Sequence, residues 1–203
     1  MPKPEFVHIE NVVASVTLNQ RIDLEKVVRS FPNVEYDPKQ FPGLVYRLEK
    51  PKTATLIFNS GKMVCTGSKS EKEAVEAIYK IVEHLKEADI EITGEPIIQV
   101  QNIVASASLG GELNLEEAAV NLQDVMYEPD QFPGLIYRMK NPKVVILLFG
   151  SGRLVLTGAK SEEEVYTGVN NVLQTLLELE IMKNSFIEIT KNEEQMLVTS
   201  SYF

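Results

Sequence analysis

Apolar and polar residues alternate along residues 6–18, which is the two-residue period of a β-strand. One set of alternate positions is a plain core-facing set: Val12, Ala14, Val16 and Leu18. The other set is small, mostly uncharged and only partly apolar: Ile9, Asn11, Val13, Ser15 and Thr17. The sequence therefore predicts a strand whose second face is neither an ordinary core nor an ordinary solvated surface.

The chain repeats itself. Residues 34–74 align without a gap on residues 125–165 at an offset of 91, with 23 identities in 41 positions. The same offset pairs ENVVAS at 10–15 with QNIVAS at 101–106. Two copies of one unit favour a pseudo-twofold body over a solenoid, which needs three or more repeats.

Each copy predicts the same elements. An opening strand (6–18 and 97–109) is followed by a short helix with Asp23 or Asn114 at its N-cap. In the first copy three strands come next, at 44–49, 53–58 and 62–66, joined by Pro-Lys and Ser-Gly turns. A long helix closes each copy, at about 70–89 and 161–180, and begins with a Ser-x-x-Glu capping box. We place the boundaries at 1–93 for the first repeat, 94–190 for the second and 191–203 for a tail.

The strands carry apolar residues on both faces. Leu56 and Phe58 alternate with Thr55 and Ile57, and Val64 alternates with core-type neighbours. Two long and two short helices, each with a single apolar stripe, can cover only one face of such a sheet. The other face is either an interaction surface or is buried in a sandwich or homodimer, and the pattern leaves both open.

Composition points away from nucleic acid at first. The 203 residues carry 20 basic and 29 acidic side chains, a net charge of −9, whereas phosphate binding depends on Lys and Arg. One cysteine, Cys65, and two histidines exclude a disulfide framework and predict no metal centre or cofactor. The longest apolar run, 144–149, is too short to span a membrane. We therefore expect no membrane association.

No constellation of catalytic residues is present in the sequence. The segment Asn59-Ser60-Gly61-Lys62 is similar to the end of a phosphate-binding loop, but it lacks the upstream glycine and a hairpin follows it. Cys65 falls on the core parity and is expected to be inert packing, and His84 is expected on a solvated helix face. The sequence predicts a protein that is not an enzyme.

The repeated motifs carry a family resemblance. QFPGL(V/I)YR followed by PK, LxF, SGK/R and TGxKS, present twice, closely resembles the TATA-binding protein family over about residues 6–182. The acidic pI of about 4.9 and the near-identical motifs in both halves resemble its archaeal form. The resemblance implies an α+β fold, a pseudo-twofold saddle in which a curved ten-stranded antiparallel sheet carries four helices on its convex face.

The same resemblance implies a general transcription initiation factor. Its concave sheet would bind the minor groove of A·T-rich promoter DNA, the TATA element, and paired phenylalanines would kink the duplex; the family is itself a familiar example of such kinking. The alternative is a non-enzymatic interaction scaffold that dimerises through the exposed sheet face. Implied partners are transcription factor B and, indirectly, RNA polymerase. The implied location is the cytoplasm with its nucleoid, or the nucleus in a eukaryote.

Site residues follow from the motif positions. The resemblance implies that the amides of Asn11 and Asn102 contact the centre of the DNA site. It implies that two phenylalanine pairs, Phe41 with Phe58 and Phe132 with Phe149, act as wedges, and that Leu56 and Leu147 support these rings. Groove contacts are Val13, Val64, Thr66, Val104, Val155 and Thr157. Phosphate contacts are Arg47, Lys62, Arg138 and Arg153. The partner is expected at the acidic second-repeat loop, at Glu128 and Asp130.

Overall fold

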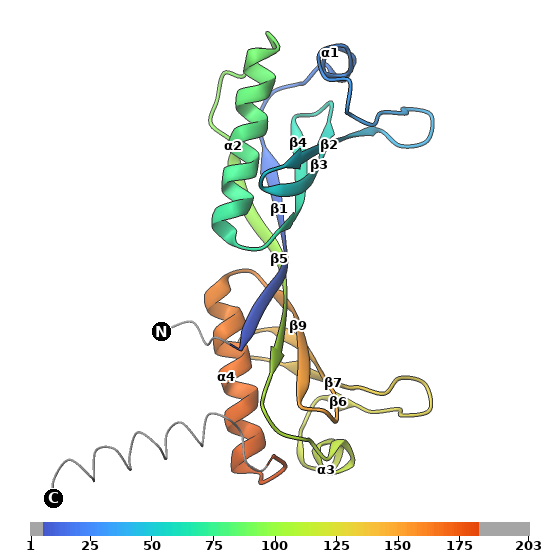
Figure 1. The fold of residues 1–203 in the computed structure, drawn as a ribbon, viewed down its shortest axis with the longest axis vertical. Helices are drawn as coiled ribbons and strands as arrows, with labels where there is room; N and C mark the ends of the chain where they lie inside the picture. Colours follow the sequence, from blue (N-terminus) through green and yellow to red (C-terminus); the bar gives the residue numbers. More distant parts are fainter. Residues whose placement is uncertain (1–5, 183–203) are drawn as a thin grey trace, which may run out of the picture. The chain divides into compact units, whose positions relative to one another are not determined.

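The computed structural model describes residues 6–182 (Figure 1). In chain order the elements are β1 (Val7–Thr17), α1 (Leu24–Ser30), β2 (Gly43–Glu49), β3 (Lys52–Phe58), β4 (Lys62–Ser68), α2 (Glu71–Glu87), β5 (Ile97–Ser108), α3 (Leu115–Asn121), β6 (Val125–Met126), β7 (Leu135–Met139), β8 (Val144–Leu148), β9 (Arg153–Ala159) and α4 (Glu162–Glu178). Each predicted strand and helix is present within a few residues of its expected bounds. Residues 183–190 and the predicted tail, 191–203, lie outside the described part.

The described strands form one sheet in the order β2-β3-β4-β1-β5-β9-β8-β7-β6, which confirms the α+β class. The sheet has nine strands rather than the ten expected. In the second repeat β6 pairs Val125 with Tyr137 and Met126 with Ile136, but the matching segment of the first repeat makes only the bridge between Glu35 and Val45. In the second repeat Arg138 N–H also donates to the Asp124 carbonyl at 3.0 Å, next to the two paired residues of β6.

The chain divides into two compact units. One comprises residues 9–104 and 160–162; the other comprises the described residues 6–8, 105–159 and 163–182. The boundaries between the units fall within β1 and β5. The two units are therefore not the same as the two sequence repeats, which meet at the linker. We call the two compact units the first unit and the second unit.

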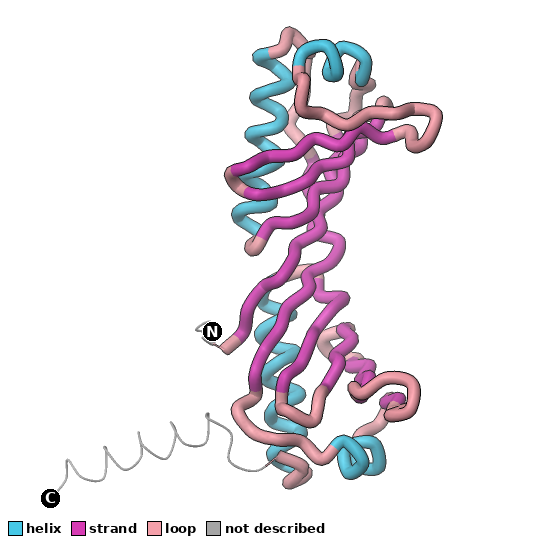
Figure 2. Tube along the Cα trace, turned by 45° about the vertical axis from the view of Figure 1, so that its right-hand side comes forward, coloured by secondary structure: helices cyan, strands magenta, loops and turns pink. Residues whose placement is uncertain are grey.

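In the first unit β2, β3 and β4 form an antiparallel meander, with Leu44 opposite Ile57 and Thr55 opposite Cys65. Helix α2 covers one face of these strands (Figure 2). Its apolar stripe is buried: Ala74, Ala77, Ile78, Ile81, Val82 and Leu85. Each large aliphatic side chain so buried contributes about 1.5–3 kcal/mol, and this packing decides which strand face becomes core.

The second unit repeats the arrangement with β9, β8 and β7, where Ile146 lies opposite Leu156 and Tyr137. Helix α4 supplies the covering stripe: Val165, Gly168, Val169, Val172, Leu173 and Leu176. A Cβ at Gly168 would lie 2.8 Å from Cδ1 of Leu156, so the helix approaches β9 closely at this position.

Local sequence signals account for the helix starts. The Asp23 carboxylate accepts a hydrogen bond from Lys26 N–H at 3.1 Å, and the Asn114 side chain accepts one from Glu117 N–H at 3.2 Å. Ser70 caps α2 by accepting from Glu73 N–H at 3.0 Å, as the capping box predicts. The Glu73 carboxylate reaches back one residue further than expected, to Lys69 N–H.

One expectation for α2 was wrong. His84 does not lie on a solvated face but is half-buried, with Nδ1 2.9 Å from the Tyr46 hydroxyl. Phe31 packs edge-on against Tyr46 with ring centroids 5.3 Å apart. In the second repeat the positions of Phe31 and His84 hold Leu122 and Thr175, so this aromatic cluster belongs to the first unit alone.

Candidate nucleic-acid interface

In each unit the strand face opposite the long helix is lined by half-buried side chains. Along β3 the residues Thr55 and Ile57 are fully buried while Leu56 and Phe58 are half-buried, as the alternation predicts. The half-buried set of the first unit includes Asn11, Val13, Leu56, Phe58, Val64 and Thr66. In the second repeat it includes Asn102, Val104, Leu147, Phe149, Val155 and Thr157. By the division into units, Asn102 and Val104 belong to the first unit and the other four residues to the second. All the predicted groove residues thus occupy half-buried positions of their strands, which alternate with buried core positions.

Asn11 is held by the strand beside it. Its Oδ1 accepts a hydrogen bond from Gly67 N–H at 2.7 Å, and the Thr66 hydroxyl lies 3.1 Å from Nδ2 and 3.2 Å from Oδ1. A backbone N–H can only donate, so this contact determines which end of the amide is oxygen. The Nδ2 group has two N–H donors, and within residues 6–182 its hydrogen-bond partner is the Thr66 hydroxyl, which leaves one donor for a ligand.

A β-bulge makes the Gly67 donor available. Between the pairs Val12 with Ser68 and Ala14 with Cys65, one residue of β1 lies opposite two of β4. Gly67 has φ of +100°, which a residue with a Cβ rarely adopts. The bulge removes Gly67 N–H from the regular ladder and turns it toward Asn11. The second repeat has the matching glycine, Gly158, with φ of +96°.

The two predicted phenylalanine pairs are formed. Phe41 and Phe58 have ring centroids 5.9 Å apart and ring planes at 66°, and Phe132 and Phe149 have the same separation at 67°. Both are edge-to-face contacts. Phe41 is 44% exposed and Phe132 is 37% exposed, although large aromatic side chains are usually covered. Each unit therefore presents a ring pair at the end of its apolar face.

Basic side chains lie around these faces. Lys62, Arg138 and Arg153 are exposed, and Arg47 is exposed but paired, with Nε 3.1 Å from Oε1 of Glu35. Glu35 has no acidic counterpart in the second repeat, where Met126 occupies its position. Arg47 is therefore paired with a carboxylate at a position where the second repeat, which contains the matching Arg138, has an uncharged residue.

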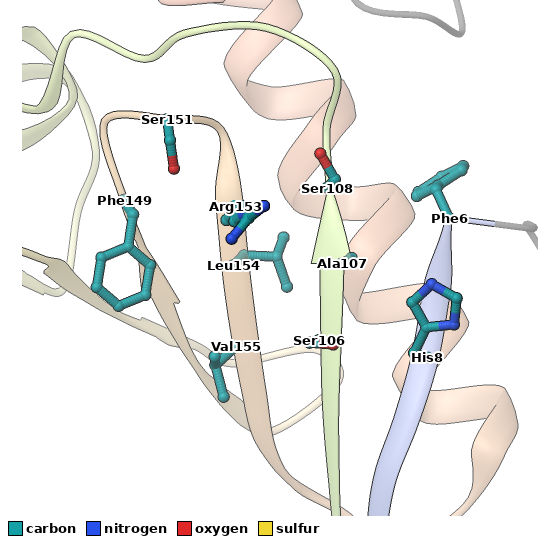
Figure 3. Close-up of a pocket in the computed structure, with 10 residues that line it drawn as sticks. All are labelled: Phe6, His8, Ser106, Ala107, Ser108, Phe149, Ser151, Arg153, Leu154 and Val155. Atoms are coloured by element: carbon teal, nitrogen blue, oxygen red, sulfur yellow. The ribbon is translucent and has the colours of Figure 1, made fainter.

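A pocket of about 660 Å³ opens in the second unit (Figure 3). It combines predicted and unpredicted residues: Phe6, His8, Ser106, Ala107, Ser108, Phe149, Ser151, Arg153, Leu154 and Val155. Phe6 and His8 enter because the start of β1 runs beside the end of β5, where Ser108 N–H donates to the Phe6 carbonyl at 3.4 Å. Sequence reasoning missed both residues, since this adjacency depends on the pairing of distant strands.

Further face residues could have been found from the sequence. Val45 is half-buried opposite Leu56, and Ile136 is half-buried opposite Leu147. The alternation of Leu44, Tyr46 and Leu48, all buried, with the residues between them indicates this orientation. Val45 and Ile136 are not among the site residues predicted from the motifs.

The loops that carry Phe41 and Phe132 have matching backbones. Phe41 N–H donates to the Asp37 carbonyl at 2.9 Å, and Phe132 N–H donates to the Glu128 carbonyl at 2.9 Å. The side chains differ in charge, because Lys39 of the first loop is replaced by Asp130 in the second. Glu128 and Asp130 are both exposed.

Cys65 lies on the core side of β4, as predicted, and is fully buried. Burial raises the pKa of its thiol above the ordinary value, and hydroxyls of Thr55 and Thr53 oppose that rise more weakly. A raised pKa leaves less of the reactive thiolate.

In residues 6–182 no group of three or more His, Cys, Asp or Glu side chains is placed to hold a metal ion. No helix in this range is long and apolar enough to cross a bilayer.

These features define a class of protein: two sequence repeats on one open antiparallel sheet, in which each unit has a long helix on one strand face and half-buried apolar residues with a phenylalanine ring pair on the other. The model of the family described as transcription factor TFIID, or TATA-binding protein, matches residues 6–88 and 97–179. The chain belongs to this family, which confirms the predicted resemblance.

Individual relatives agree. The TATA-box-binding protein of Sulfurisphaera tokodaii is 55% identical over 183 residues, covering 90% of this chain and 92% of that protein. That of Pyrodictium occultum is also 55% identical, over 90% of this chain and 91% of its own length. The structure of the Methanococcus jannaschii protein is similar with a TM-score of 0.78 and 51% identity, covering 86% of this chain and 99% of that one.

Proposed function

We propose that this protein is a non-enzymatic general transcription initiation factor. It binds the minor groove of A·T-rich TATA promoter DNA, kinks the duplex with its phenylalanine pairs, and recruits transcription factor B and, through it, RNA polymerase. The proposal rests on the half-buried, mostly apolar strand faces, which bear the oriented amide of Asn11 in the first repeat and a phenylalanine ring pair at matching positions of both repeats. Family membership and the names of the relatives support the same conclusion.

The chemistry of the face fits A·T pairs. In the minor groove A·T and T·A present only acceptors, adenine N3 and thymine O2, whereas guanine adds an N2 amino group. Asn11 offers a donor to such acceptors, because Gly67 N–H occupies its Oδ1. Val13 and Val64 offer no acceptor for a guanine amino group, so burying that group against them would cost a hydrogen bond. This difference would favour A·T-rich sites.

The ring pairs fit the role of wedges. A side chain that unstacks a base step must be large and apolar, and it must be uncovered before DNA binds. Phe41 and Phe132 are large, apolar and exposed. Their ring partners Phe58 and Phe149 directly follow the buried residues Ile57 and Leu148, which supply the core contacts of β3 and β8. Each wedge would offset the loss of base stacking with apolar contact.

The acidic loop of the second unit fits a basic partner. Glu128 and Asp130 lie beside Phe132, at the end of the proposed DNA face, and the matching loop beside Phe41 contains Lys39. A surface of one charge attracts a partner of the opposite charge and sets the orientation of the complex. We propose that transcription factor B docks at the second loop, so that it distinguishes the two halves of a nearly symmetric DNA face.

DNA binding can be tested directly with the full chain. A gel shift compares a duplex containing a TATA element with one in which that element is replaced by G·C pairs, and a donor–acceptor dye pair at the duplex ends reports bending by energy transfer. We expect tight binding and bending of the first duplex only. Equal retention of both duplexes would contradict recognition of A·T pairs. Dimerisation through the sheet face with no DNA binding at all would favour the scaffold alternative.

Partner docking needs a separate test. Glu128→Arg, alone or with Asp130→Arg, should abolish the ternary complex with transcription factor B while binary DNA binding survives. Asp37→Arg is the matched control, because Asp37 and Glu128 hold the same place in loops of matching backbone hydrogen bonds. If Glu128→Arg still forms the ternary complex at wild-type affinity, the docking site lies elsewhere.

A further inference from the structure

The glycines of the two QFPGL motifs lie at the phenylalanine pairs. A Cβ added at Gly43 would lie 2.6 Å from Cε1 of Phe41 and 3.0 Å from Cε1 of Phe58. At Gly134 the corresponding distances are 2.7 Å to Phe132 and 3.0 Å to Phe149. Separations under 3.0 Å are shorter than a Cβ and a ring carbon can adopt, so a side chain here would force ring movement.

Strand register explains the geometry. Gly43 lies directly opposite Phe58 in the β2–β3 ladder. Phe41 precedes Gly43 by two residues, and its ring lies over the side of Gly43 on which a Cβ would project. A side chain at position 43 would therefore project between the two rings. With only hydrogen there, the ring of Phe41 can fold over the glycine and meet the ring of Phe58 edge-to-face.

The backbone does not require glycine at these positions. Gly43 and Gly134 are not among the residues with positive φ, unlike Gly61 and Gly152 in the following hairpins. Glycine at the start of a strand costs conformational entropy and packs no side chain of its own. In both repeats, the space that a side chain would need at this glycine is occupied by a phenylalanine ring pair.

We infer that Gly43 and Gly134 are positioning residues for the two phenylalanine wedges. Each glycine sets the place of a ring pair before DNA arrives, so that the rings need not be ordered during binding. This inference rests on the proposed function in its DNA-bending part, but its structural part holds for the protein alone. At Gly43 the conflicting atoms are all ring atoms, which can move, so alanine should displace the rings and leave the fold intact. At Gly134 the shortest contacts are also to the rings, and the Leu148 carbonyl oxygen at 3.3 Å needs only a small shift.

The structural part can be tested without DNA. The full chain is labelled with 4-fluorophenylalanine, and the ¹⁹F resonances of each pair are assigned by single Phe→Leu variants. Gly43→Ala should shift the resonances of Phe41 and Phe58 and leave those of Phe132 and Phe149 in place; Gly134→Ala should do the reverse. Gly94→Ala is the control, since nothing lies within 4 Å of a Cβ at that position. Unmoved resonances of the adjacent pair would overturn the inference.

Thermal unfolding then identifies the source of any instability. Gly43→Ala should lower the melting temperature in the wild type and have a smaller effect in Phe41→Ala, because the two residues are coupled through the clash. Equal effects in both backgrounds would show that the ring is not what the glycine accommodates, and would overturn the inference. Gly61→Ala should be severe in either background, because its Cβ would meet the Gln20 carbonyl oxygen at 1.9 Å.

Bending is measured last, by energy transfer on the TATA duplex at saturating protein. Gly43→Ala should lose roughly half of the bend, since one of two wedges is displaced, while Gly94→Ala bends as the wild type does. Displaced rings with an unchanged bend would refute the positioning role. A wild-type protein that bends no duplex would instead refute the proposed function, and the fluorine spectra would still decide whether glycine places the rings.

Discussion

The N–H of Gly67 donates to Oδ1 of Asn11 at 2.7 Å, across a bulge that brings a mid-strand amide and a glycine of positive φ together. The two residues are 56 positions apart in sequence. Their contact turns an asparagine, a residue disfavoured in strands, into an oriented donor on the open face. It also explains why β4 contains a glycine where a β-branched residue would otherwise suit a strand.

Asn11→Asp should weaken binding to A·T-rich DNA while the fold persists. Aspartate has the same shape and can still accept from Gly67 N–H, but it has no donor for adenine N3 or thymine O2 and adds a negative charge near phosphate. Titration of the TATA duplex, with melting temperature measured in parallel, checks this expectation. Wild-type affinity in the aspartate variant would contradict a donor role for Asn11.

Phe58→Ala and Ile57→Ala should separate DNA bending from stability, because adjacent residues of β3 face opposite ways. Ile57 is fully buried, so its truncation should cost about 2–5 kcal/mol of unfolding free energy. Phe58→Ala should cost less and should reduce the bend, since its ring lies on the open face. Denaturant unfolding and energy transfer are measured for both variants. A large stability loss with normal bending in Phe58→Ala would mark it as a core residue.

Glu35→Gln should strengthen DNA binding at low salt and steepen its salt dependence. The Glu35 carboxylate pairs with Arg47 at 3.1 Å, so removing its charge leaves Arg47 for phosphate. One added phosphate contact changes the slope of log K against log salt by about 0.9. The exposed ion pair contributes at most about 1 kcal/mol to folding, so stability should barely change. Glu25→Gln, which removes the same charge from α1, is the control and should leave that slope nearly unchanged.

Thr55→Val should stabilise the protein by about 1 kcal/mol, because a buried hydroxyl without a good partner costs free energy. The Thr55 hydroxyl lies beside the Cys65 thiol and can donate to a thiolate, yet in residues 6–182 it makes no hydrogen bond of ordinary geometry. The second repeat has Ile146 at this position. Denaturant unfolding measures the change, and a destabilised valine variant would show that the hydroxyl is satisfied.

Stability should decline in alkaline solution, partly through Cys65. Burial raises the pKa of this thiol in the folded state, so its contribution is fully present below the unfolded-state pKa of about 8.5 and is lost as pH rises through the folded value. Burial and then the charge of Glu87 raise the pKa of Tyr46, which adds a loss above about pH 10. Cys65→Ala should lessen the fall that begins near pH 8.5, as melting temperatures across pH 7–11 would reveal.

A thiol reagent offers a direct check on Cys65. The side chain is fully buried, so in native protein it should react only as fast as the fold opens, and added denaturant should release it. Rapid labelling of the folded chain would contradict both the burial and the raised pKa.

Most of the elements, the repeat and the two faces of each strand could be predicted from the order of residues alone. Alternation along residues 6–18 and around Thr55 to Phe58 assigns core and open positions correctly, because side-chain direction in a strand depends only on local parity. The serine and asparagine caps are equally local. Once the open face and the QFPGL motifs were identified, the candidate site was largely specified.

The contacts between residues far apart in the chain could not be predicted in this way. The Gly67–Asn11 hydrogen bond, the ring pairs over Gly43 and Gly134, the Glu35–Arg47 ion pair and the Tyr46–His84 contact depend on strand register and helix placement. The hydrogen bonds and the ion pair among these contacts join residues 12 to 56 positions apart in the sequence, so they arise from packing and not from local conformational preference. The same reason explains why the sheet has nine strands and not the expected ten. Glu35 makes only a single bridge to Val45, and the length of such a pairing depends on how the two segments pack and not on the alternation of residues along the chain.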